Sequence, residues 1–173
     1  MNNAGIGPFS HFDAMTGQQI QDTIALNTIF PTKLTRQILP YLHSPALILN
    51  VSSYTALLPP PYLAVYAGTK AHNNAFSQSL AQELSNVGVI SLLTGSVNSG
   101  SNRKPVSFMR PSAETYAKHV LKAVGCGRRV IMPYWPHLIQ TFFLLRIPGA
   151  LLERAMKTEM KKELNSAYGQ KSE

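Results

Sequence analysis

A tyrosine and a lysine stand four positions apart in the segment Tyr66-Ala67-Gly68-Thr69-Lys70. On a helix this spacing places the phenol and the ammonium group on one face. A nearby cation stabilises a phenolate and lowers the pKa of tyrosine from about 10 toward neutral pH. A tyrosine tuned in this way can transfer protons as a general acid or base. The pair therefore predicts a proton-transfer site, although the spacing alone is weakly specific in a chain with seven tyrosines.

Two other polar positions stand where they would serve such a site. Ser52-Ser53 follows an apolar run over residues 46–51, and the separation of 13 positions from Ser53 to Tyr66 favours Ser53 over Ser52. Asn27 falls in an expected helix that contains Pro31. Proline has no N–H group, so the Asn27 carbonyl loses its helical partner and is free to accept a hydrogen bond from water.

These residues, with the segment Asn2-Asn3-Ala4-Gly5, resemble the short-chain dehydrogenase/reductase family. The matching features are its NNAG motif, its helix asparagine, its serine after a strand and its YxxxK pair. The resemblance covers nearly the whole chain and is most specific from Asn2 to Glu83. It implies an oxidoreductase that interconverts a ketone and a secondary alcohol with NADP or NAD, with NADP favoured.

The same resemblance implies a role for each residue. Tyr66 would exchange a proton with the substrate oxygen, and Ser53 would hold that oxygen. Lys70 would lower the pKa of Tyr66 and bind the nicotinamide ribose, and Asn27 would position a water that links Lys70 to solvent. The residues expected to contact the cofactor are Asn2, Ala4, Gly5, Tyr66, Lys70, Gly95, Val97 and Ser99.

One family motif has no counterpart in the sequence. No TGxxxGxG segment, the turn that binds the cofactor pyrophosphate at a helix N-terminus, is present. We therefore expect an N-terminally truncated member of the family with weak cofactor binding. The alternative is a catalytically inactive fragment that acts as a binding or membrane-peripheral module.

A subgroup of the family is indicated by the second half of the chain. Residues 111–124 and the segment Trp135-Pro136-His137 resemble the very-long-chain 3-oxoacyl-CoA reductase and 17β-hydroxysteroid dehydrogenase branch. This resemblance implies a lipid-like substrate and a location at the endoplasmic reticulum membrane surface or in the cytoplasm. Family members often pair through two helices, so the resemblance also implies a homo-oligomer.

Helices and strands that would position these residues alternate along the chain. A capping box at Thr16 and Gln19 starts a helix that runs to Leu39. Apolar runs and caps then predict strands over 46–51, 89–94 and 129–133, and helices over 66–86 and 113–124. This order predicts an α/β protein, the C-terminal half of a doubly wound parallel-sheet Rossmann fold, over residues 1–134. Residues 135–173 would form a C-terminal helical region, either a lid or a membrane-peripheral element.

Charge is distributed unevenly along the chain. Residues 1–100 contain as many acidic as basic side chains, so the net charge of +8 lies entirely after residue 100. An apolar stretch over 138–152 is too interrupted to span a bilayer. Basic residues lie within it or follow it: Arg146, Arg154, Lys157, Lys161, Lys162 and Lys171. Apolar and cationic residues together indicate an interfacial helix that contacts a membrane.

Composition excludes several classes of protein. The chain is 45% hydrophobic and 14% charged, which is typical of a globular domain rather than a disordered one. The single cysteine, Cys126, excludes an intrachain disulfide, and the five histidines lack metal-ligand spacing, so no metal site is predicted. No nucleic-acid-binding motif accompanies the basic charge, so no nucleic-acid partner is expected.

Overall fold

The computed structural model describes residues 1–169, and its centre is a parallel sheet of three strands in the order β1-β2-β3. β1 spans Ala46–Ser53, β2 spans Val87–Thr94 and β3 spans Val130–Ile131. The pairing of β1 with β2 runs from Ala46 opposite Val87 to Ser53 opposite Thr94. The carboxyl ends of both strands therefore meet at one edge of the sheet, and the predicted α/β class with a parallel sheet is confirmed.

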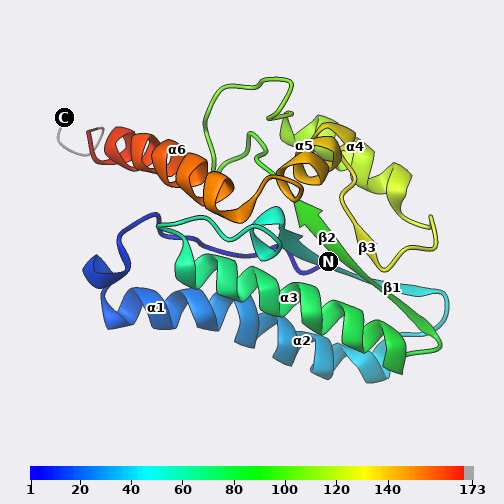
Figure 1. Cartoon of the computed structure of the whole chain (residues 1–173). Coiled ribbons are helices and arrows are strands. Elements are labelled where there is room, and N and C mark those ends of the chain that lie inside the picture. The colour runs from blue at the N-terminus through cyan, green and yellow to red at the C-terminus, as the bar shows by residue number, and fades with distance from the viewer. Residues whose placement is uncertain (170–173) are drawn as a thin grey trace.

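Helices cover both faces of this sheet (Figure 1). α1 (Gly17–Ile24), a π-helical segment (Ala25–Ile29), α2 (Phe30–Ile38) and α3 (Ala64–Glu83) lie on one side. α4 (Ala113–Ala123) and α5 (Trp135–Leu144) lie on the other, and α6 (Gly149–Gly169) follows α5. Short 3-10 turns occupy Phe12–Ala14, Leu39–Tyr41 and Tyr54–Ala56.

Two apolar clusters hold these layers together. Ile48 of β1 and Val89 of β2 pack with Leu80 of α3 on one face. Ile90 and Leu92 of β2 point to the opposite face, where they pack with buried side chains of α4 and β3. Because side chains alternate along a strand, each strand is apolar on both faces, as expected for a parallel strand covered by helices on both sides.

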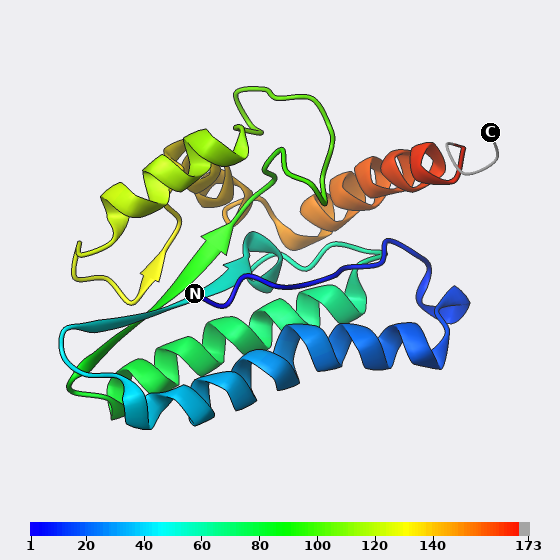
Figure 2. The same cartoon turned by 180° about the vertical axis from the view of Figure 1, so that it is seen from behind.

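The first residues of the chain lie along the outer edge of β1 (Figure 2). The Asn2 backbone N–H donates to the Leu49 carbonyl at 2.8 Å, and the Val51 N–H donates to the Asn2 carbonyl at 2.9 Å. The Asn2 side chain donates to Thr35 Oγ1 at 3.1 Å and to Asn50 Oδ1 at 2.7 Å. This pairing fixes the position of the loop that follows, which runs toward α3.

The expected helix from Gly17 to Leu39 contains an irregular segment. Its start is confirmed, because the Thr16 side chain accepts from the Gln19 N–H and the Gln19 side chain accepts from the Thr16 N–H. The chain then widens into a π-helical turn over Ala25–Ile29 before Pro31. Proline cannot supply an N–H to the carbonyl four residues earlier, so the regular pattern is already broken there. π-turns within helices are often found at functional sites.

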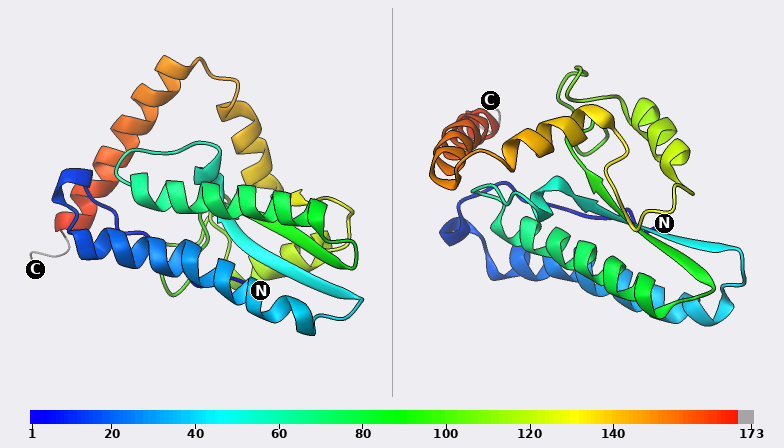
Figure 3. Two further views of the ribbon diagram at one scale, coloured as in Figure 1. Left: turned by 90° about the horizontal axis from the view of Figure 1, so that it is seen from below. Right: turned by 45° about the vertical axis from the view of Figure 1, so that its right-hand side comes forward.

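Two helices form the C-terminal part of the described chain (Figure 3). α5 begins at Trp135, ends at Leu144 and is separated from α6 by a short bend that contains Pro148. The apolar and basic residues expected on one interfacial helix are thus divided between two. No helix within residues 1–169 combines the length and apolar character needed to cross a membrane.

Candidate functional site

A cavity of about 600 Å³ opens at the carboxyl edge of the sheet. Ser53 at the end of β1, Tyr66 at the start of α3 and Gly95 directly after β2 line it together. The opposite wall comes from the C-terminal helices and includes Leu152 and Met156 of α6. Three of the residues that the sequence singled out thus meet in one cavity, although they are far apart in the chain.

The Tyr66 hydroxyl lies within hydrogen-bonding reach of the Ser53 side chain. Burial raises the pKa of Tyr66, the bond to Ser53 lowers it, and the neighbouring Tyr54 raises it further. The net shift is upward, opposite to the lowering expected from Lys70. The Lys70 ammonium nitrogen lies 5.5 Å from the centre of the Tyr66 ring.

Lys70 is a buried cation behind Tyr66. Its ammonium nitrogen donates to the Val51 carbonyl at 2.9 Å, and burial lowers its pKa from 10.5 to about 8. Ser52, the alternative to Ser53, points elsewhere: its hydroxyl donates to the Lys70 carbonyl at 2.7 Å. Of the two adjacent serines, Ser53 therefore lines the cavity and Ser52 binds the backbone of α3.

Asn27 is fully buried and binds the loop after Asn2 through its side chain. Its Oδ1 accepts from the Ile6 N–H at 2.9 Å, while its Nδ2 donates to the Ile6 carbonyl at 2.7 Å and to Thr69 Oγ1 at 3.0 Å. The Asn27 carbonyl, which Pro31 leaves without a helical partner, accepts from Asn73 Nδ2 at 2.9 Å. An amide side chain from α3 therefore uses one of the two acceptor positions of this carbonyl, and the second is the one that a water could use.

Two glycines allow this loop to lie against the reactive pair. A Cβ atom at Gly7 would lie 2.6 Å from Cδ2 of the Tyr66 ring, closer than such contacts allow. A Cβ atom at Gly5 would lie 3.2 Å from Asn27 Oδ1 and 3.5 Å from the Lys70 ammonium nitrogen. The loop thus packs tightly against the Tyr66 ring at Gly7 and lies beside Lys70 at Gly5.

The residues expected to contact a cofactor are only partly brought together. Tyr66 and Gly95 line the cavity, and Gly5 lies beside Lys70. Four others lie outside the cavity lining: Asn2 in the sheet pairing, Ala4 exposed, Val97 against the α4-side cluster and Ser99 paired with the Asn102 backbone.

Several residues of the site were not predicted from the sequence. Asn73 stands three positions after Lys70 on the same helix face, and this spacing is the one signal that could have identified it. Gly7 and Thr69 carry no sequence signal of their own, because their roles are contacts with distant parts of the chain. Arg110 also lines the cavity, and it follows a long loop that the sequence shows only as polar.

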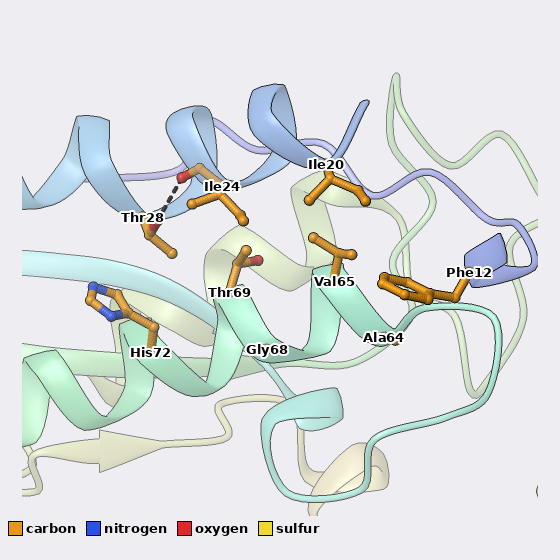
Figure 4. A pocket seen from close by; sticks show the side chains of 9 residues that line it. All are labelled: Phe12, Ile20, Ile24, Thr28, Ala64, Val65, Gly68, Thr69 and His72. Atoms are coloured by element: carbon orange, nitrogen blue, oxygen red, sulfur yellow. Dashed lines mark hydrogen bonds between the residues drawn. The ribbon is translucent and has the colours of Figure 1, made fainter. Parts of the chain in front are cut away.

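A second hollow lies between α1 and α3 (Figure 4). It has a volume of about 500 Å³ and is lined mainly by apolar side chains, among them Ile20, Ile24 and Val65. Figure 4 shows these side chains facing one another across the two helices, with His72 at one end. Its two hydroxyl groups, on Thr28 and Thr69, donate to backbone carbonyls, so the cavity with Ser53 and Tyr66 is the better candidate for chemistry.

Comparison with known proteins agrees with this assignment. The family model described as short chain dehydrogenase matches residues 1–108. The very-long-chain 3-oxoacyl-CoA reductase of Kluyveromyces lactis is 31% identical over 156 residues, which cover 80% of this chain and 44% of that protein. The protein of the same name from Rattus norvegicus is 39% identical over 116 residues, covering 64% of this chain and 37% of that protein. The chain thus spans less than half the length of these two relatives.

Solved structures show the same fold. The 3-ketoacyl-(acyl-carrier-protein) reductase from Brucella melitensis, complexed with NADH, is 27% identical with a TM-score of 0.55, over 58% of this chain and 45% of that one. A short-chain dehydrogenase from Sphingobium yanoikuyae, in complex with NADPH, is 23% identical with a TM-score of 0.65, over 86% of this chain and 65% of that one. At the latter identity the likeness establishes the fold alone.

The lowered pKa of Lys70 predicts a particular dependence of stability on pH. Between pH 8 and 10.5 the unfolded chain holds a proton on this lysine that the folded chain has released. Stability therefore rises with pH through this window, and the cost of the buried charge is fully present below it. Relative to a Lys70→Met variant, the wild type should gain about 1.5 kcal/mol of unfolding free energy between pH 8 and 9.5.

Urea denaturation of both proteins at the two pH values measures this gain. Both proteins contain the same other titrating groups. The difference between their changes in unfolding free energy from pH 8 to pH 9.5 is therefore due to Lys70. Equal changes in unfolding free energy for the two proteins would show that Lys70 keeps an ordinary pKa and is not buried as described.

Proposed function

We propose that this chain, which belongs to the short chain dehydrogenase family, provides the carbonyl-binding and proton-transfer residues of an oxidoreductase that interconverts a ketone and a secondary alcohol with NAD(P)(H). The observation that supports this most directly is the meeting of Ser53 and Tyr66 in one cavity, with Lys70 buried behind the tyrosine.

Tyr66 is the proposed acid. Its raised pKa keeps the phenol protonated at neutral pH, which is the form that can protonate a carbonyl oxygen during reduction. Ser53 lies next to the hydroxyl and would hold the same oxygen in place. Lys70 has a pKa of about 8 and is mostly charged at neutral pH, so it would stabilise negative charge that develops as Tyr66 gives up its proton.

A nicotinamide cofactor would supply the hydride, and two features of the chain suit it. The Lys70 ammonium group has three N–H donors and uses one on the Val51 carbonyl, which leaves others for ribose hydroxyls. Gly95 lines the cavity with main-chain atoms alone, since a Cβ atom there would lie 2.5 Å from Nδ1 of His137, so a nicotinamide ring would meet backbone at this point. We favour NADP over NAD on the family resemblance.

The substrate is proposed to be lipid-like. The wall opposite Ser53 includes a group of apolar side chains: Leu144 at the end of α5, Ile147 after it, and Leu152, Met156 and Met160 of α6. Such a wall would bury an acyl chain or another extended apolar body. α6 is also joined to the loop after β2 by an ion pair of 2.6 Å between Lys104 and Glu163, so it would act as a lid over the cavity.

Replacing the proposed acid tests this function. With a long-chain 3-oxoacyl-CoA as substrate and millimolar NADPH, Tyr66→Phe should reduce ketone-dependent NADPH oxidation at least 100-fold, since general acid catalysis typically contributes about 100- to 10,000-fold. Tyr41→Phe, a change at an exposed tyrosine, should retain the wild-type rate. Repeating the assay with NADH measures the cofactor preference. Equal rates for wild type and Tyr66→Phe would remove Tyr66 from the reaction.

A peripheral membrane contact is proposed for the C-terminal helices. α5 and the bend after it expose large apolar side chains: Trp135, Leu138, Ile139, Phe142, Phe143 and Leu145. On α6, Arg154, Lys157, Lys161 and Lys162 surround one shallow depression. Lys171, which the sequence also placed in this basic series, lies outside the described residues. Exposed apolar side chains favour insertion at a lipid surface, and each cation near anionic headgroups contributes about 1 kcal/mol. This contact would place the chain at the endoplasmic reticulum surface.

Liposome co-sedimentation distinguishes this contact from a general attraction of a basic protein to anions. Phe143→Asp should weaken binding of the full chain to phosphatidylserine-containing vesicles several-fold, because a charge replaces a side chain that is 63% exposed on α5. Leu121→Asp makes the same change on α4, at a side chain that is 72% exposed, and should bind like wild type. Equal losses in the two variants would contradict a membrane contact through α5.

A homo-oligomer formed through the α1–α3 side is the remaining proposal. Ile24, which lines the hollow between α1 and α3, is exposed, and so are the apolar residues Ile29 and Phe30 further along the same helical segment. Light scattering during gel filtration should show a dimer or tetramer in the wild type and a smaller species for Ile24→Asp. Val106→Asp, at an exposed position in the loop after β2, should leave the mass unchanged. A wild-type monomer at high micromolar concentration would exclude the assembly.

A further inference from the structure

The charged side chains that line the cavity are not equally neutralised. Four of them face it: Lys104, Arg110, Glu159 and Glu163. Glu163 is bound by Lys104 at 2.6 Å, and Glu159 is bound by Lys162 at 3.1 Å. Within residues 1–169, no carboxylate forms an ion pair with Arg110. Its charge is therefore available inside a cavity in which both acids already have cationic partners.

Arg110 is held in place by uncharged partners. Its Nε donates to Ser96 Oγ at 2.9 Å, and its Nη1 donates to the Pro105 carbonyl at 3.1 Å. A guanidinium group has five N–H donors, so three are left over, including both on Nη2. These bonds reduce the conformational freedom that an arginine normally loses when it binds a ligand.

Ser96 adds a second donor at the same place. Its Oγ accepts from Arg110 Nε and also from Asn102 Nδ2 at 3.1 Å, and all three residues line the cavity. With both acceptor positions of the oxygen used, the serine O–H is left to donate. A fixed guanidinium beside a hydroxyl donor is the arrangement that binds carboxylates and phosphates.

We propose that Arg110 and Ser96 form an anion subsite of the cavity that holds Ser53 and Tyr66, so that the substrate is an amphiphilic anion. Its carboxylate or phosphate binds Arg110, and its apolar chain lies against Leu152, Met156 and Met160. This inference rests on the proposed use of the cavity for a carbonyl substrate, and it adds the chemical class of the group that orients that substrate.

Binding of simple probes tests the subsite without requiring a reaction or a cofactor. Decanoate, decanol and monodecyl phosphate share one apolar chain and differ in the head group. By isothermal titration calorimetry of the full chain, decanoate or monodecyl phosphate should bind at least tenfold more tightly than decanol, as expected for a charge-assisted hydrogen bond. The relative affinities of the two anions show whether a carboxylate or a phosphate is preferred. Equal affinities for decanol and both anions would overturn the proposal.

Variants then assign the preference to Arg110. Arg110→Gln should lose the preference for the anions while it binds decanol as the wild type does. Arg110→Lys keeps the charge without the fixed geometry and should retain part of the preference. Arg103→Gln removes an exposed cation of the same loop that does not line the cavity, and should behave as wild type. Equal losses in Arg110→Gln and Arg103→Gln would show only a general effect of charge and would contradict the subsite.

Two further measurements separate this proposal from others. Tyr66→Phe should still bind decanoate, so a failure of the proposed reaction and a failure of the subsite can be told apart. NADPH at millimolar concentration should not compete with decanoate. Competition that Arg110→Gln abolishes would assign Arg110 to the cofactor diphosphate and overturn its role toward the substrate.

Discussion

The buried side chain of Asn27 holds the candidate site together. It pairs with both backbone groups of Ile6 and donates to Thr69 on α3, while the backbone carbonyl of Asn27 accepts from Asn73 on the same helix. A buried amide left without partners costs about 1–3 kcal/mol for each unmade bond, so these contacts strongly favour one arrangement. They join three segments distant in sequence: the loop after Asn2, the π-turn and the helix that carries Tyr66 and Lys70.

The position of that loop determines the surroundings of the reactive pair. Gly7 brings backbone against the Tyr66 ring at a distance that a side chain would not permit, and Gly5 lies close to Asn27 and beside Lys70. Burial then acts on each in the expected direction, raising the pKa of the phenol and lowering that of the ammonium group. The chemistry of the pair thus depends on a packing contact made by residues that do not react.

The cavity has two sides of different origin. Ser53 and Tyr66 come from the end of β1 and the start of α3, whose backbones are held by the sheet and by buried hydrogen bonds. The opposite side comes from the loop after β2 and from α6, which are joined by the exposed ion pair of Lys104 and Glu163. An exposed ion pair contributes little to stability. The protein therefore combines a fixed reactive side with a substrate-binding side that is more weakly attached.

The sequence by itself determined the parallel α/β architecture and the family. Apolar periodicity locates β1, β2 and α4 to within a few residues, and a helix cap such as the one at Thr16 depends on bonds between near neighbours. The pairing of Tyr66 with Lys70 was also visible, because helix geometry fixes which positions share a face.

Only the tertiary structure decided how these groups behave. Through burial it raised the pKa of Tyr66, which the sequence predicted to be lowered. It also joined the Asn27 backbone carbonyl to Asn73 and left Val97 and Ser99 outside the cavity lining. It also placed Arg110 in the cavity without a carboxylate partner among residues 1–169. Burial and contacts between distant segments are properties of the whole packed chain, and no local pattern of residue types encodes them.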